Sequence, residues 1–179
     1  MHQITWFQAH LVFPDTEFKL QDKVWRTLEK VNEHTYQKDI PDVLSPSYAT
    51  IRLVCRSEVE SVTANMRIYM QIPLAGTEFA PADERAKQAT TYEPVELKAL
   101  RDLTMFGSKP LNTPRLLDES IQMQDSNGLV PGGFFICYVW ETVPGLCLRD
   151  AFGSDAFWAL DKSERSKIKA ALPREFEYI

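Results

Sequence analysis

Hydrophobic and polar positions alternate most clearly in the middle of the chain. Residues 50–55 are β-branched and apolar, and residues 64–72 alternate between apolar and polar side chains before stopping at Pro73. A polar segment over 56–63 separates the two runs. This pattern predicts two antiparallel strands joined by that segment. An earlier mixture of apolar and polar positions over 3–13, which stops at Pro14, predicts a first extended segment.

Two stretches show helical spacing instead. One covers residues 17–34, with Asp15 or Thr16 as its predicted cap. Its apolar positions are Phe18, Leu20, Val24, Trp25, Leu28 and Val31. The other covers 83–106 and has a second start near Pro94, since proline suits the first turn of a helix. Gly107 is its predicted end.

A second strand pair is predicted over 113–123 and 133–141. The segment 125–128 between them, Asp-Ser-Asn-Gly, is a strong turn signal. The later strand is apolar on both faces, so we expect it to be central in its sheet. A final helix is predicted over 161–172, with Asp161 or Ser163 as its cap and Pro173 ending or bending it.

This order of elements predicts an α+β fold. We expect a mostly antiparallel five-stranded sheet with one packed central helix, together with N-terminal and C-terminal helices. The chain of 179 residues fits a single domain. Within it we expect an N-terminal extension over 1–48, the sheet and central helix over 49–145, and a connector with the terminal helix over 146–179.

Composition excludes several classes of function. The net charge of −5 argues against a nucleic-acid binder, which usually carries a concentrated basic surface. The three cysteines, Cys55, Cys137 and Cys147, have neither zinc-site nor disulfide-framework spacing. No signal peptide or membrane-spanning run is visible. We therefore expect a soluble, intracellular, cytoplasmic protein with no cofactor, no metal, no nucleic acid and no membrane as partner.

Several short segments resemble the small lobe of the protein kinase-like superfamily. The segments 113–117 and 138–145 are similar to its fourth strand and to its fifth strand with the hinge. Arg67 lies where the third strand of that family carries its phosphate-contacting lysine, and Glu96 lies where the helix glutamate pairs with that lysine. The segments 3–7, 13–17 and 130–133 also resemble kinase-like proteins of filamentous fungi, and this similarity covers nearly the whole chain.

The sequence departs from that family at the positions that perform its chemistry. A kinase small lobe needs a glycine-rich hairpin that lets backbone N–H groups approach the phosphates, but the first glycine here is Gly76. The lysine position holds arginine, which is not an interchangeable substitute. No His-Arg-Asp or Asp-Phe-Gly sequence occurs in the chain. We therefore expect no kinase activity from this chain alone, and no catalytic residue is assigned.

Other chemistry has weaker support. The histidines His2, His10 and His34 show no pattern with a nucleophile, and surface or structural roles fit them better. Paired carboxylates such as Asp118 with Glu119 usually decorate solvated faces. Gly132 and Gly133 fit a tight turn into a strand better than a phosphate cradle, because no helix start follows them. The Arg67–Glu96 pair is interpreted as a structural ion pair rather than an anion site.

Three functional hypotheses remain. The first is a non-catalytic kinase-like small lobe that binds a protein partner or a second copy of itself. Its interface would be a cluster of apolar residues in the C-terminal part of the chain, with the candidate residues Trp140, Val143, Leu146, Phe157 and Trp158. The second is a small-molecule-binding protein or biosynthetic enzyme with a pocket near Arg67, Glu96 and Tyr69. The third is an inactive fragment of a longer kinase-like protein.

Overall fold

The structure is a computed structural model that describes residues 5–7, 14–21, 23–42, 45–106, 114–143 and 155–176. The chain divides into two compact units, Met1–Val143 and Pro144–Ile179. The first unit contains the sheet with helices α2 (Ala82–Ala86) and α3 (Val95–Phe106). The second unit contains α4 (Asp155–Ala159) and α5 (Lys162–Phe176).

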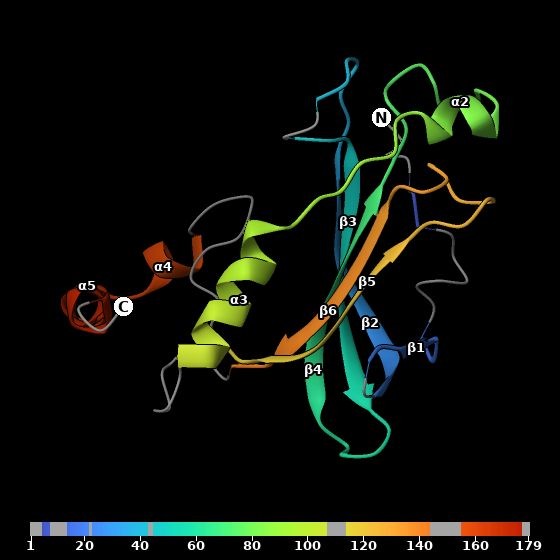
Figure 1. Ribbon diagram of the computed structural model, residues 1–179. Coiled ribbons are helices and arrows are strands. Elements are labelled where there is room, and N and C mark those ends of the chain that lie inside the picture. Colours follow the sequence, from blue (N-terminus) through green and yellow to red (C-terminus); the bar gives the residue numbers. More distant parts are fainter. Residues whose placement is uncertain are drawn as a thin grey trace. The chain divides into compact units, whose positions relative to one another are not determined.

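The sheet of the first unit has six antiparallel strands in the order β1-β2-β3-β4-β6-β5 (Figure 1). They are β1 (Glu17–Lys19), β2 (Val24–Tyr36), β3 (Tyr48–Ser57), β4 (Thr63–Gln71), β5 (Leu116–Met123) and β6 (Phe134–Glu141). The α+β class and the antiparallel sheet are confirmed. The expectation of five strands is corrected to six, because β1 and β2 both join the sheet. The extended segment expected over 3–13 lies mostly outside the described residues.

The prediction of a helix over 17–34 is wrong, because this segment forms β1 and most of β2. Two irregularities in the pairing of β2 with β3, between Thr27 and Glu29 and between Lys30 and Asn32, explain the error. Each adds a residue to β2, Leu28 and then Val31, and so shifts the two-residue alternation. Trp25, Leu28 and Val31 consequently recur every three residues, as they would on one side of a helix. Pairing with β3 overrides this local signal.

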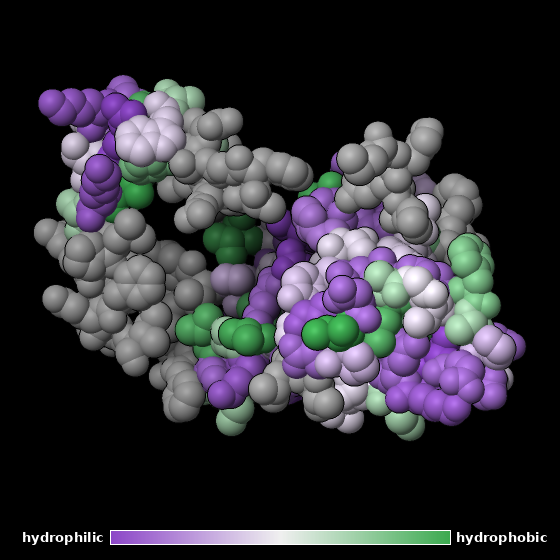
Figure 2. Space-filling model, turned by 90° about the horizontal axis from the view of Figure 1, so that it is seen from above, coloured by the Kyte–Doolittle hydropathy of each residue, from purple (hydrophilic) through white to green (hydrophobic). Residues whose placement is uncertain are grey.

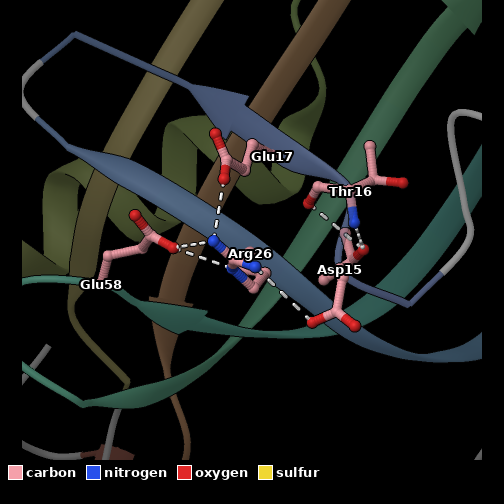
Figure 3. A network of polar contacts seen from close by, with 6 residues as sticks. Asp15, Thr16, Glu17, Arg26 and Glu58 are labelled. Atoms are coloured by element: carbon pink, nitrogen blue, oxygen red, sulfur yellow. Dashed lines mark hydrogen bonds and ion pairs between the residues drawn. The ribbon is translucent and has the colours of Figure 1, made fainter.

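Polar contacts fix β1 against its neighbours (Figure 3). The guanidinium of Arg26 on β2 contacts Asp15, Glu17 and Glu58 at once, with 3.9 Å to Asp15 Oδ1 and 2.8 Å to Glu17 Oε1. Asp15 has a φ of 70°, and its N–H donates to the carbonyl of Thr27 at 2.8 Å. The residue predicted to cap a helix therefore begins a strand pairing instead.

The two helices of the first unit agree with the predicted interruption before Pro94. Residue 94 lies just before α3, and its carbonyl accepts from the N–H of Lys98 at 3.2 Å. Leu97 and Leu100 of α3 are buried against the sheet, whereas Val95 and Met105 on the outer side of the helix are exposed. The predicted end at Gly107 lies outside the described residues.

The turns around β5 and β6 follow the sequence signals. Asp125 accepts the N–H of Asn127 at 2.8 Å through Oδ1 and the N–H of Gly128 at 3.1 Å through its carbonyl. Gly132 has a φ of +79°. A Cβ on Gly133 would lie 2.9 Å from the carbonyl oxygen of Val130, so glycine is needed there for close approach. A strand follows this pair, as predicted, and β6 lies between β4 and β5, so its central position is confirmed.

Side chains on the two faces of the sheet form two cores. The smaller lies under α3 and is mainly aromatic. The larger lies on the opposite face and includes Trp25, which is fully buried. Trp25 Nε1 donates to buried Asp118 Oδ2 at 2.9 Å. These residues lie on β2 and β5, which have three strands between them in the sheet. The sheet therefore curls enough for two non-adjacent strands to meet across the larger core.

In the second unit, Asp161 Oδ1 accepts the backbone N–H of Glu164 at 2.8 Å, which confirms Asp161 as the cap of α5. The helix continues to Phe176, so Pro173 does not end it. Proline inside a helix removes one backbone hydrogen bond, and the bend expected there stays a prediction. Among the described residues, no helix is long and apolar enough to cross a membrane.

Two of the cysteines are buried free thiols. Burial raises the pKa of Cys55 to about 12, and it raises the pKa of Cys137 well above its ordinary value. Since the thiolate is the reactive form, we expect a Cys147→Ser variant to show no reaction with Ellman's reagent at pH 8 while folded. Unfolding in guanidinium should then release two reactive thiols. A rapid native reaction would contradict the burial of this core.

Candidate binding site

Arg67 and Glu96 meet between the sheet and α3. Arg67 lies in the middle of β4, and its Nη1 forms an ion pair with Glu96 Oε2 on the first turn of the helix. Tyr138 on neighbouring β6 donates its hydroxyl to the same carboxylate oxygen at 2.9 Å. Arg67 and Tyr138 are opposite each other in the β4–β6 pairing, so both side chains lie on the face that α3 covers. One carboxylate thus joins three elements.

Two arginines lie against the ring of Trp140 on β6. The Cζ of Arg67 is 5.6 Å from the ring centroid, and the Cζ of Arg52 on β3 is 5.7 Å from it. Arg52 also donates to Asn65 Oδ1, at 2.8 Å from Nη2. Asn65 donates through Nδ2 to Thr142 Oγ1 at 3.2 Å. Polar contacts therefore continue from the ion pair to the end of β6.

A row of tyrosines extends the site along the same face. Tyr69 lies two residues after Arg67 and stacks on Tyr138, with ring centroids 6.3 Å apart. Tyr48 on β3 lies 5.3 Å from Tyr69 and 5.6 Å from Tyr36, measured between centroids. Tyr92, just before α3, stacks on Tyr48 at 5.5 Å. Because neighbouring strands contribute successive rings, the face of the sheet carries a continuous aromatic surface.

The site keeps Arg67 charged, and it keeps Tyr138 and Tyr92 neutral. Burial acts to lower the pKa of Arg67, but the Glu96 carboxylate and the tyrosines around it outweigh burial, so the pKa is raised. Burial and the nearby Glu96 raise the pKa of Tyr138 well above its ordinary value. Burial raises the pKa of Tyr92 to about 12. None of these phenols can therefore act as a base near neutral pH.

The structure brings Arg67, Glu96 and Tyr69 together, as the sequence predicted. The candidate interface residues are spread over several places. Trp140 is only 8% exposed because it packs in the arginine cluster, whereas Val143 just after β6 is exposed. Phe157 and Trp158 lie on α4, in the other unit; their rings contact edge to face at 5.2 Å, and Trp158 is 60% exposed. Leu146 lies outside the described residues.

Arg52, Asn65 and Tyr48 were missed by sequence reasoning. The signal was present in β3, where Ala49, Ile51, Leu53 and Cys55 are fully buried. The intervening positions, Tyr48, Thr50 and Arg52, must face the opposite side of the sheet. Treating 50–55 as uniformly apolar hid this second, polar and aromatic face.

Two arginines and a row of aromatic rings are the groups that this face presents. The Glu96 carboxylate at its centre is already shared by Arg67 and Tyr138. No group of three or more potential metal ligands occurs among the residues that the structure describes. Arg52 has no carboxylate partner in the same described part of the chain. Thr50 Oγ1 is buried without a hydrogen-bond partner there.

Comparisons with known proteins give no relative: no protein-family model matches the chain, and no curated protein or solved structure is significantly similar to it.

Proposed function

We propose that this chain is a non-catalytic, kinase-like small-lobe domain that works by binding protein, including a second copy of itself. The order of elements supports the proposal: the strands β2, β3 and β4 come before α3, and β5 and β6 complete the sheet after it. Arg67 on β4 pairs with Glu96 on α3, as a lysine on the third strand pairs with a helix glutamate in kinases. This ion pair and the order of elements are the observations that support the proposal.

The absence of catalysis is supported by the sequence of the segment between β2 and β3. In a kinase, a glycine-rich hairpin at the start of the sheet covers the phosphates. The corresponding segment here, residues 37–47, contains Pro41 and Pro46 and no glycine. Tyr138 also donates to Glu96, and Arg67 lies over the ring of Trp140. The arginine therefore has protein partners where a kinase lysine would contact phosphate.

The observation that carries the binding proposal is the exposure of large apolar side chains outside the cores. Trp158 on α4 is 60% exposed, and Ile121 and Met123 on β5 are also exposed. Figure 2, seen from the end of the sheet near α2, shows hydrophobic side chains scattered among hydrophilic ones. Exposed apolar groups that gather on one element mark interfaces more often than isolated ones do.

Light scattering coupled to size exclusion tests this proposal on the whole chain. We expect a species with twice the 20.6 kDa mass of one chain at micromolar concentrations. Trp158→Ala should weaken association severalfold while the melting temperature stays within a few degrees, because the ring is mostly in solvent. A strictly monomeric wild type at high concentration would remove the self-association part. Unfolding of the Trp158→Ala variant would instead place this residue in a core.

A second candidate function is binding of a small anionic, aromatic molecule at the tyrosine and arginine face. The specific observation in its favour is that Arg52 has no carboxylate partner among the described residues and lies over the ring of Trp140. Phenyl phosphate is a suitable probe. The second candidate requires a thermal shift that Arg52→Ala abolishes, and it fails if the probe leaves the melting temperature of the wild type unchanged.

A further inference from the structure

The two edges of the sheet differ. At one edge, β1 has only three residues, and Arg26 ties the side chain of Glu17 to β2. At the other edge, β5 has eight residues and a single neighbouring strand, β6, within the part of the chain that the structure describes. A long edge strand with apolar residues is a template for pairing with another chain. The β5 edge is therefore the place in the sheet best suited to bind another strand.

Hydrogen bonding identifies which residues of β5 face the open edge. The N–H of Gln124 donates to the carbonyl of Gly133 at 2.8 Å, so this position faces β6. Backbone groups in an antiparallel pair alternate between the two sides of the strand. Glu119, Ile121 and Met123 therefore direct their N–H and C=O groups away from β6. The N–H of Glu119 already donates to Asp118 Oδ1 at 2.9 Å. Of these three residues, Ile121 and Met123 are therefore the ones whose N–H groups have no acceptor in the part of the chain that the structure describes.

The side chains beside this edge are apolar. Ile121 is 55% exposed and Met123 is 77% exposed. Their partners in β6 are Ile136 and Phe134, which belong to the core under α3. Residues directly opposite in a sheet share a face, so Ile121 and Met123 lie on the α3 face. They line a shallow groove with Tyr92 and Phe134 that the helix does not fill.

We propose that a second copy of this chain docks on this edge, with the two β5 strands antiparallel about a two-fold axis at Ile121. This inference rests on the proposed function and names its surface. In this register the N–H and C=O of Ile121 pair with the same groups of the partner copy, and the N–H of Met123 donates to the partner carbonyl of Glu119. Every free donor is then satisfied by an acceptor that also faces the edge.

Charge favours this register and a symmetric partner. A register centred on Glu119 places the two Glu119 carboxylates opposite each other. A register centred on Gln122 places Glu119 of one copy opposite Asp125 of the other, which again brings two carboxylates together. The register centred on Ile121 separates the two Glu119 residues by four positions, about 13 Å along the strands. Each of these carboxylates keeps Arg101 of α3 as its own partner, at 2.9 Å between Nε and Oε2. The apolar side chains meet at the axis and the acidic ones lie outside it.

Sedimentation equilibrium and disulfide trapping on the whole chain test the proposal. Ile121→Lys places two cations at the axis and should weaken dimerisation at least tenfold. The matched control is Phe79→Lys, which alters a fully exposed apolar residue in the segment between β4 and α2 and should leave dimerisation unchanged. In a Cys147→Ser background, Ile121→Cys should form a disulfide-linked dimer on mild oxidation, because the paired Cα atoms would lie about 5.5 Å apart. Gln122→Cys, on the opposite face, should not.

The outcomes separate this inference from the proposed function. If Ile121→Lys dimerises like the wild type while Trp158→Ala does not, association is real and the β5 surface is wrong. If the wild type is monomeric, both self-association and this inference fail. If Gln122→Cys crosslinks and Ile121→Cys does not, the two-fold register at Ile121 is wrong. Circular dichroism of each variant excludes unfolding as the cause of a loss.

Discussion

Replacing Trp25 by phenylalanine is expected to lower the free energy of unfolding by about 3 kcal/mol. The indole is fully buried, and its N–H donates to Asp118, a buried carboxylate. Phenylalanine keeps most of the apolar contact but removes this donor, so that one oxygen of Asp118 loses its partner inside the protein. Because the bond also joins β2 to β5 across the larger core, its loss should loosen the curl of the sheet. Urea denaturation measures the change.

The matched control is Trp158→Phe, the same substitution at a tryptophan that is mostly exposed. We expect it to change the free energy of unfolding by less than about 0.5 kcal/mol. Equal losses in both variants would mean that Trp25 contributes no more than an ordinary aromatic side chain. The contact between β2 and β5 would then not stabilise the fold.

Replacing Glu96 by alanine is expected to cost about 1–2 kcal/mol of unfolding free energy. The carboxylate accepts from both Arg67 and Tyr138, and its removal leaves a guanidinium and a phenol without their shared acceptor. The value stays modest because the Glu96 side chain is 37% exposed, so that water replaces part of the lost contact. Urea denaturation of the single and double variants at Glu96 and Arg67 isolates the pair.

A control for charge alone is Glu93→Ala, which removes a more exposed carboxylate that pairs with Arg101. This change should be close to neutral. A double-mutant cycle that gives no coupling between Arg67 and Glu96 would contradict a structural role for their ion pair.

The sequence predicted the elements whose local and long-range signals agree. β3, β4, α3, β5 and β6 were all found near their observed bounds, since alternation, Pro94 and the turn at Asp125 point the same way as the packing. β2 was not found. Its added residues at Leu28 and Val31 produce a helical spacing, and only the pairing with β3 reveals the strand.

The site was predicted only in part for a similar reason. Arg67 and Glu96 were found through the resemblance to a kinase small lobe, which supplies positions for both. Arg52 and Tyr48 have no counterpart in that resemblance, and they join the site only because pairing of β3 with β4 fixes which face they share. Trp140 was expected at an interface. Two arginines lie over its ring, an arrangement that depends on three strands meeting.

Isothermal titration calorimetry with ATP and magnesium tests most directly the claim that the Arg67–Glu96 pair holds the helix to the sheet instead of holding a nucleotide. We predict no binding heat for the wild-type chain, and none for Arg67→Lys, which restores the residue that kinases carry at this position. A saturable heat with the wild type that is lost in Arg67→Ala would contradict this account.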